Sequence, residues 1–172
     1  FFKALGTNNR YSSASADQLP HHVASNYMLG AGMLIPVPDI DHTDFMLIIG
    51  ANPIVSNGSL MTAPGVGKRL KAIQQRGGKV VVVDPRRTET ARKADQHLFI
   101  RPETDALFML AMVHTLFEEQ LVTLGHLEDR IDGLEQLAEA VKPYSPETVE
   151  AACGMTAEAI RELAQELSLI HI

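Results

Sequence analysis

Apolar runs along the chain predict a short parallel sheet. Phe45–Ile49 and the valines of Lys79–Val83 have no polar break, which is typical of strands buried on both faces of a parallel sheet. His97–Ile100 predicts a third strand, and the helical spacing of Val66–Arg76 predicts a helix between the first two. Phe45–Val83 is therefore expected to form one strand–helix–strand unit with a right-handed connection.

Other periodic segments predict further helices. Upstream, Ser13–Gly30 carries Leu19, Val23 and Tyr27 on one side, with Pro20 in a first turn or at a kink. This spacing favours a helix with one apolar side.

Downstream of the sheet, threonines mark where helices are expected to start. Thr88 is expected to cap a short helix at Ala91–Ala94, and Thr104 a long helix from Asp105 to about Gln120. Apolar or partly apolar positions of the long helix include Leu107, Leu110, Ala111, His114 and Leu116. Three shorter helices are expected at Glu128–Val141, Pro146–Cys153 and Thr156–Leu167.

Together these elements predict an α/β fold, a Rossmann-like parallel sheet flanked by helices, with a helical C-terminal part. Residues 1–120 are expected to form the domain that contains the sheet, and residues 121–172 a helical extension. The sequence starts at Phe1 and ends on apolar residues, so we expect processed or truncated ends.

Composition narrows the class of protein. The 172 residues are 45% hydrophobic and 21% charged, as in ordinary soluble globular chains. The net charge of -6 argues against a general nucleic-acid surface, and no run of about 20 apolar residues predicts a membrane helix. The single cysteine, Cys153, excludes an internal disulfide and a cysteine-held iron–sulfur cluster within this chain.

Arginine and proline follow two of the predicted strands. Asp84–Arg87 (Asp-Pro-Arg-Arg) comes directly after one strand, and Arg101-Pro102 after the next. Ligands of open α/β sheets bind at the carboxyl ends of the strands, where helix N-termini and arginine forks favour phosphate groups. Asn52, which follows the first strand, would lie on the same edge. The pattern predicts a binding surface for a phosphorylated cofactor at this edge of the sheet.

These motifs also have alternative interpretations. The alternative for Asp84–Arg87 is an exposed turn with two solvated arginines, which the shared edge with Asn52 and Glu103–Asp105 disfavours. Gly65–Lys68 is not a phosphate loop, because Thr62 replaces the first glycine of that motif and Arg69 replaces its serine or threonine. No GxGxxG fingerprint follows the first strand, and the histidines lack metal-binding spacing.

Three segments together resemble the molybdopterin oxidoreductase family, which includes dimethyl sulfoxide reductases, periplasmic nitrate reductases and formate dehydrogenases. They read DFMLIIGANP, GGKVVVVDPRRTETARKAD and LFIRPETDALFMLAM, in that order and at the family's spacing. The resemblance covers roughly residues 1–120. It implies a Rossmann-like domain that holds one guanine dinucleotide arm of bis(molybdopterin guanine dinucleotide), the cofactor that carries molybdenum or tungsten.

The resemblance also assigns cofactor contacts to the turns after the three strands. In this sequence the assigned residues are Gly50, Ala51, Asn52, Pro53 and Ser56 in the first turn, Asp84, Pro85, Arg86, Arg87 and Thr88 in the second, Arg101, Glu103, Thr104 and Asp105 in the third, and Asn8 and Ser12 in a looser match. Glu103 stands where the family's turn has glycine. Asp105 would meet a guanine edge or a ribose.

In the family, the molybdenum ligand and the iron–sulfur cysteines precede this region, and later domains hold the other pterin. The resemblance therefore implies a fragment of an oxidoreductase that performs two-electron or oxygen-atom chemistry. A 4Fe-4S cluster is expected in the parent but outside this chain. Expected partners are the parent's remaining domains and an electron-transfer subunit, with no nucleic acid and no direct membrane insertion.

The fragment alone is expected to be inactive and to bind no metal. Its compartment stays open, with the cytoplasm favoured over the periplasm.

Two other functions compete with this interpretation. One is a non-catalytic scaffold, like the molybdopterin-like part of the large iron–sulfur subunit of respiratory complex I. Asn52, the arginine pair and Asp105 argue against it, because a scaffold has no phosphate to neutralise. The other is an ordinary nucleotide-binding Rossmann enzyme, which the missing glycine fingerprint disfavours.

Overall fold

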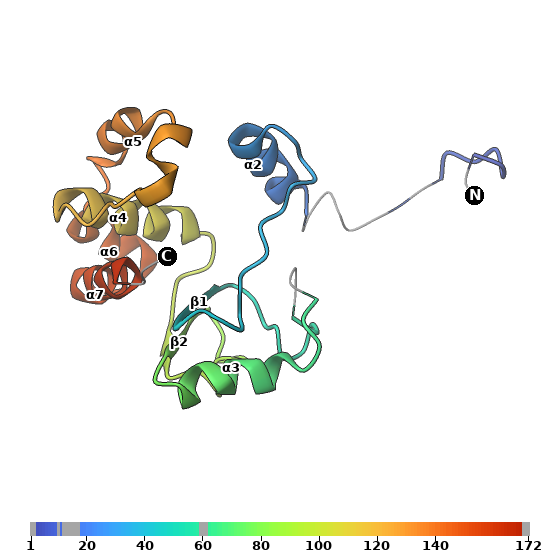
Figure 1. Cartoon of the computed structure of the whole chain (residues 1–172), viewed down its shortest axis with the longest axis horizontal. Helices are drawn as coiled ribbons and strands as arrows, with labels where there is room; N and C mark the ends of the chain where they lie inside the picture. Colours follow the sequence, from blue (N-terminus) through green and yellow to red (C-terminus); the bar gives the residue numbers. More distant parts are fainter. Residues whose placement is uncertain (1–2, 10, 12–17, 59–61, 170–172) are drawn as a thin grey trace. The chain divides into compact units, whose positions relative to one another are not determined.

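The computed structural model describes residues 3–9, 11, 18–58 and 62–169. The chain divides into two compact units, Phe1–Pro38 and Asp39–Ile172. Figure 1 labels the main helices and strands of both units.

The first unit contains helix α2, Leu19–Leu29, with proline in its first turn and Gly30 in the left-handed conformation at its C-terminus. This helix confirms the described part of the one expected at Ser13–Gly30, and Leu19, Val23 and Tyr27 on its predicted apolar side are exposed. Ser25 is the one buried residue among those described in this unit. A segment this short has too little surface to build a core of its own.

The second unit contains a three-stranded parallel sheet, which confirms the predicted α/β fold. Strands β1 (Phe45–Ile49), β2 (Lys79–Val83) and β3 (Gln96–Leu98) lie in the order β1-β2-β3. The third strand was expected at His97–Ile100, but the ladder ends at Leu98, and the backbone N–H of Arg101 already donates to Cys153 (2.8 Å). At Arg101 the backbone therefore pairs with helix α6 (Pro146–Cys153) and no longer with β2.

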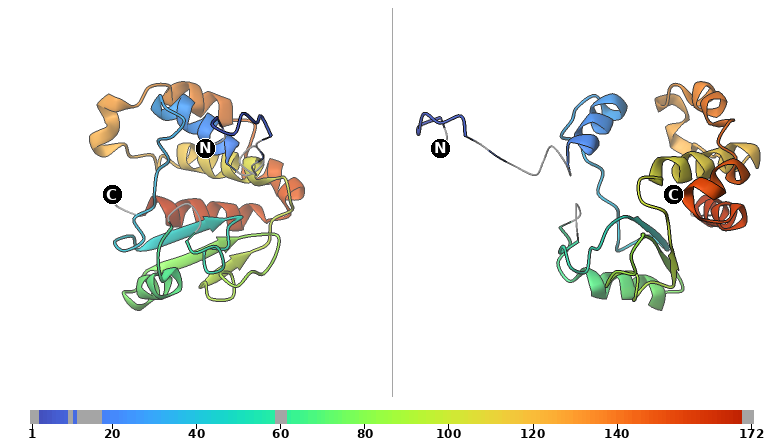
Figure 2. Two further views of the ribbon diagram at one scale, coloured as in Figure 1. Left: turned by 90° about the vertical axis from the view of Figure 1, so that its right-hand side faces the viewer. Right: turned by 180° about the vertical axis from the view of Figure 1, so that it is seen from behind.

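Helices cover both faces of this sheet, in three layers that Figure 2 shows from two sides. On one face, Val80 and Val82 pack with Leu70 and Ile73 of α3 (Val66–Gln75). On the other face, Val81 and Val83 belong to a core with α4 (Asp105–Glu118), α6 (Pro146–Cys153) and α7 (Ala157–Ser168). That core includes Phe108, Met112, Val149, Cys153, Ile160 and Leu163.

Each β2 valine is at most 1% exposed, so burial on both faces explains the uninterrupted apolar run. Cys153, at 0% exposure, is the small core residue that its apolar helix end predicts.

The link between α3 and β2 is short because Gly78 lets two backbones approach closely. A β-carbon at Gly78 would lie 2.4 Å from the carbonyl oxygen of Asp44 and 2.7 Å from a side-chain carbon of Ile73. The N–H of Gly78 donates to the Ile73 carbonyl at 2.9 Å, closing the helix end. Any larger residue here would separate α3 from the start of β1.

The helical predictions are confirmed in part. Pro146–Cys153 is helical as predicted, and Thr156 caps α7 through the N–H of Ala159. The helix expected at Glu128–Val141 is instead a 3-10 helix, η2 (Gly125–Arg130), followed by α5 (Leu134–Val141). Gly133 separates the two, in the left-handed conformation that ends or precedes helices.

The prediction of a short helix at Ala91–Ala94 is wrong. Residues 89–93 form turns, although Thr88 does cap them by accepting from the N–H of Ala91 at 3.1 Å. The N–H of Asp95 donates back to the Val80 carbonyl at 2.9 Å. A return to the sheet within so few residues leaves no length for a helix.

Helices after residue 120 share the core of β2 and α4, and the boundary between compact units falls after Pro38. The boundary expected at residue 120 stays a prediction for the intact parent. Over the described ranges, no helix combines the length and the apolar character that crossing a bilayer requires.

The turn into α4 contains a non-glycine residue in the left-handed region. Glu103 has φ +70°, at the position where the resemblance expects glycine. A β-carbon in that region costs about 1–2 kcal/mol. The sequence therefore keeps the turn's backbone conformation and loses some stability.

We predict that Glu103→Gly raises the free energy of unfolding by about 0.5–1 kcal/mol, because the steric cost exceeds glycine's extra entropy in the unfolded chain. Thermal unfolding followed by circular dichroism should show a rise of a few degrees in the midpoint. Glu103→Ala is the matched control, since it keeps the β-carbon. Equal midpoints for the glycine and alanine variants would contradict the assignment.

An ion pair between Glu147 of α6 and Arg161 of α7 joins these two helices. The Arg161 guanidinium, which donates to the carboxylate, lowers the pKa of Glu147 to about 2, helped by the residue's own backbone N–H. Since the folded pKa lies below the ordinary value of 4.5, the stabilisation is present above pH 4.5 and is lost as pH falls towards 2.

We expect Glu147→Gln to flatten the dependence of unfolding on pH in this window. Urea midpoints would be measured between pH 2.5 and 6 for the wild type, Glu147→Gln and the control Glu162→Gln, whose carboxylate has no ion pair among the described residues. Parallel curves for all three proteins would refute a role for Glu147 in acid sensitivity.

Candidate site at the carboxyl ends of the strands

The turns that follow the three strands lie on one edge of the sheet, as predicted. Because β1, β2 and β3 are parallel and in register, their carboxyl ends point the same way. The N–H of Gly50 donates to the Val83 carbonyl at 2.9 Å, and the N–H of Asp84 donates to the Leu98 carbonyl at 3.1 Å. Hydrogen bonds thus align each turn with the end of its neighbouring strand.

Asn52 connects the first turn with the segment after the second. Its Nδ2 donates to Glu89 at 2.8 Å, and its Oδ1 accepts from the N–H and the hydroxyl of Thr90 at 3.2 and 2.7 Å. The hydroxyl of Thr90, which is fully buried, in turn accepts from the N–H of Ile54 at 3.2 Å. The Asn52 amide therefore holds two loops together, and most of its bonding capacity is used within the chain.

The same network lowers the pKa of Glu89 below its ordinary value. The hydrogen bond from Asn52 is the largest cause that lowers the pKa of Glu89, followed by a backbone hydrogen bond. Arg92 adds an ion pair at 2.9 Å. The first and second turns are thus fixed by a charge-assisted hydrogen bond.

Asp84 is a buried carboxylate at the end of β2, with 8% of its surface exposed. Its Oδ1 accepts from the N–H of Arg86 at 2.7 Å, which closes the turn, and its backbone carbonyl accepts from Nε2 of His97 at 3.0 Å. Its other carboxylate oxygen, Oδ2, has no hydrogen-bond partner among the described residues. Oδ2 is not among the buried atoms left without a partner in the described chain, so it lies at the surface of the turn, where solvent or a ligand donor can reach it.

Arg86 and Arg87 present their side chains to solvent on this turn. Neither guanidinium has a hydrogen bond or ion pair with any described residue. Several arginines elsewhere in the same unit do have carboxylate partners, for example Arg76 with Asp44 at 3.1 Å. An unpaired arginine pair next to a buried carboxylate suits a ligand that carries both phosphate and hydroxyl groups.

The third turn is held differently from the prediction. Nη1 of Arg101 donates to the carbonyls of Ala151 and Ala152 at 3.1 and 3.0 Å, at the C-terminus of α6. Thr104 occupies the N-cap position of α4, but its hydroxyl donates back to the Arg101 carbonyl at 2.6 Å instead of capping the helix. Asp105, the first residue of α4, is half-buried.

The remaining predicted residues divide between the two units. Pro53 is buried, Ser56 is exposed, and the Ser56 hydroxyl donates to the Asn52 carbonyl at 3.2 Å. Asn8 lies exposed in the first unit. Ser12 lies outside the described residues.

Sequence reasoning missed Glu89, Thr90 and His97, which hold the turns in place. Glu89 and Thr90 belong to the segment TETARKAD, which carried the resemblance. Thr90 and Thr88 are buried there beside exposed Arg92 and Lys93, and a polar residue pattern alone does not tell these positions apart. Within the described ranges, no three His, Cys, Asp or Glu side chains come together as a metal ligand set.

Residues 1–127 match the family model described as molybdopterin oxidoreductase. The F420-dependent formate dehydrogenase subunit alpha of Methanocaldococcus jannaschii is 32% identical over 163 residues, covering 94% of this chain and 23% of that protein. The dimethyl sulfoxide/trimethylamine N-oxide reductase of Cereibacter sphaeroides is 32% identical over 170 residues, covering 94% of this chain and 21% of that protein. The chain thus spans about a quarter or less of the length of these relatives.

Among solved structures, the acetylene hydratase of Pelobacter acetylenicus is similar, with a TM-score of 0.62 and 32% identity. The match covers 74% of this chain and 17% of that one. Since the family model matches well over half of the chain and these relatives cover nearly all of it, the chain belongs to the molybdopterin oxidoreductase family.

Proposed function

We propose that this chain is the cofactor-arm domain of a molybdenum or tungsten oxidoreductase and binds a guanine dinucleotide arm of the bis(molybdopterin guanine dinucleotide) cofactor. The observation that carries the proposal is the convergence of three strand-end turns on one edge. There a buried carboxylate with one unbonded oxygen stands beside two unpaired arginines.

The residues present fit such a ligand. Arg86 and Arg87 supply positive charge for the pyrophosphate, and Oδ2 of Asp84 is an acceptor for a ribose hydroxyl. Asp105 supplies a carboxylate for the N1–H and N2–H₂ donors of guanine, a donor pair that adenine lacks.

Most of the other predicted residues would contact the ligand through their backbone or hold the three turns in position. Gly50 has φ +61°, and nothing lies within 4 Å of the position of its missing β-carbon. A ligand could therefore approach the first turn closely. Asn52, Thr88 and Arg101 use their side chains to hold the three turns, so the site is built before the ligand arrives.

When bound in the intact parent, the cofactor would supply two-electron or oxygen-atom chemistry at its metal, and this chain's residues would bind and orient it. The substrate, the metal ligand, a 4Fe-4S cluster and an electron-transfer partner belong to the parent in this proposal. The 172-residue chain alone is expected to show no turnover.

We predict that Asp105→Asn weakens binding of guanosine diphosphate, a stand-in for the cofactor arm, by roughly ten- to a hundredfold. Losing one charge-assisted hydrogen bond of this kind costs about 1.5–3 kcal/mol. Isothermal titration of the chain with guanosine and adenosine diphosphates would measure the effect. Guanosine diphosphate binding that is unchanged in Asp105→Asn would remove the guanine-reading role from this residue.

Arg87→Ala should weaken binding of both diphosphates, and the loss should shrink as ionic strength rises, because the variant removes a phosphate partner. Arg76→Ala serves as the matched control, since it removes an arginine that pairs with Asp44, away from the strand ends. Equal affinities for Arg87→Ala and the wild type at low salt would exclude Arg87 as a phosphate ligand.

A further inference from the structure

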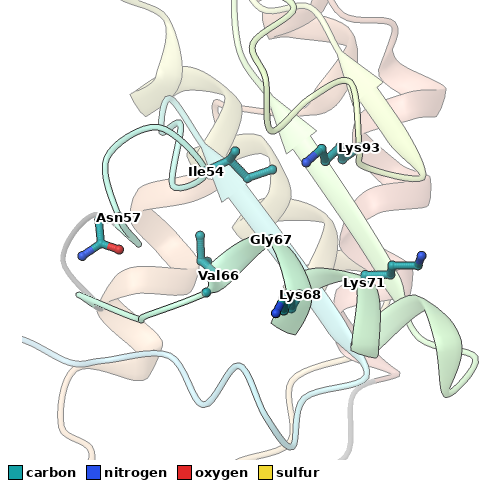
Figure 3. Close-up of a pocket in the computed structure, with 8 residues that line it drawn as sticks. Ile54, Asn57, Val66, Gly67, Lys68, Lys71 and Lys93 are labelled. Carbon is teal, nitrogen blue, oxygen red and sulfur yellow. The ribbon is translucent and has the colours of Figure 1, made fainter.

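A second cationic surface lies beside α3 and is formed by lysines, not by Arg86 and Arg87. A cavity of about 440 Å³ opens there, lined by Lys68 and Lys71 of α3, Lys93 of the turn before β3, and Ile54 and Asn57 of the loop after β1. Figure 3 shows the lysines on two sides of the cavity, Lys68 and Lys71 on the helix and Lys93 across from it. The described lining includes no acidic side chain.

Pairing separates these lysines from the others in the same unit. Lys79 pairs with Glu166 at 2.6 Å, and Lys142 pairs with Glu139. Lys68, Lys71 and Lys93 have no ion pair or hydrogen bond from their ammonium groups to any described residue, and all three line one cavity. Acidic residues outnumber basic ones in this chain, 21 to 15, so the lack of partners does not reflect a shortage of carboxylates.

The position of Lys68 also runs against local preference. Lys68 lies in the first turn of α3, which contains no acidic residue and has no side-chain cap. A cation there is unfavourable, because the helix dipole puts partial positive charge at that end. Residues that are locally unfavourable and have no stabilising partner within the chain tend to lie at functional sites. An anion bound in the cavity would offset the unfavourable charge of Lys68 at this helix end.

The walls of the cavity are tied together by hydrogen bonds. Nε2 of Gln74 on α3 donates to the Lys93 carbonyl at 3.0 Å and to Asp95 at 2.9 Å. The N–H of Ile54 donates to the Thr90 hydroxyl at 3.2 Å. Helix, turn and loop are therefore held in place, and the three ammonium groups stay on one cavity despite their mutual repulsion.

We propose that this cavity binds a small polyanion of the phosphate class, of about the size of pyrophosphate. Its volume lies within the range of small-molecule sites, about 300–1,000 Å³, and exceeds what a single halide or carboxylate would fill. Three lysines provide point charges for a phosphate-type anion without the planar fork that selects a carboxylate. The inference does not depend on the nucleotide site, since none of the three lysines belongs to it.

Titration of the ¹⁵N-labelled chain with pyrophosphate would locate the binding. The expected result is saturable shifts at the amides of Gly67, Lys68 and Lys93. Lys68→Gln, Lys71→Gln and Lys93→Gln should each lower the affinity about threefold to tenfold at low ionic strength. Lys142→Gln removes the same charge elsewhere and should leave the affinity unchanged.

Arg87→Ala separates this site from the nucleotide site. If pyrophosphate binding depended on Arg87 and not on the lysines, or if shifts were confined to residues 84–88, the cavity would not be the site and the proposal would be overturned. An acidic peptide of glutamates that shifted the same amides where pyrophosphate did not would also overturn it, because the ligand class would be wrong. Far-ultraviolet circular dichroism of each variant would confirm that the exposed substitutions leave the fold unchanged.

Discussion

Burial of β2 on both faces is the constraint on which the rest of the second unit depends. Its four valines lose contact with water almost completely, and burial of each contributes roughly 1.5–3 kcal/mol. Alternate side chains point into different cores, one with α3 and the other with α4, α6 and α7. A one-residue shift of its register would move charged Lys79 or Asp84 into a valine position and push one valine out of the core. The end of β2, and therefore Asp84, is fixed by this packing.

The neighbouring turns are then positioned relative to that fixed end. Backbone hydrogen bonds align Gly50 with Val83 and Asp84 with Leu98, and Asn52 joins the first turn to Thr90 and Glu89. The buried polar side chains of this edge hold the loops, while the exposed arginines are left without partners in the described chain. Such a division is what a binding site needs, because supporting groups that are already bonded do not have to reorganise when a ligand binds.

Arg101 shows how one residue type can serve either purpose. It follows β3 as Arg86 follows β2, and by sequence the two look alike. The carbonyls at the end of α6 are within reach of Arg101, so its guanidinium caps that helix and contributes to the position of the third turn. The Arg86 guanidinium makes no such bond to any described residue, and its charge stays available. The difference arises from a helix that begins 45 residues further along the chain, at Pro146.

The sequence by itself determined the features that local chemistry controls. Continuous valines mark a doubly buried strand, Ser145-Pro146 starts α6 and Thr156 caps α7, since burial on both faces and capping each leave a short-range pattern. The three strand-end segments were specific enough to indicate the family.

Tertiary structure alone decided the end of β3, the division of the helix expected at Glu128–Val141, and which face of α4 is buried. Nearly every position of α4 is apolar, so its own pattern could not distinguish Phe108, Ala111, Met112 and Thr115, which are buried, from Leu107 and Leu110. The ties of Asn52 to Glu89 and Thr90, the capping of α6 by Arg101 and the placement of Lys93 across the cavity from Lys68 and Lys71 likewise join residues 22 or more positions apart. Such contacts depend on which elements pack together, and no short-range pattern in the sequence records that.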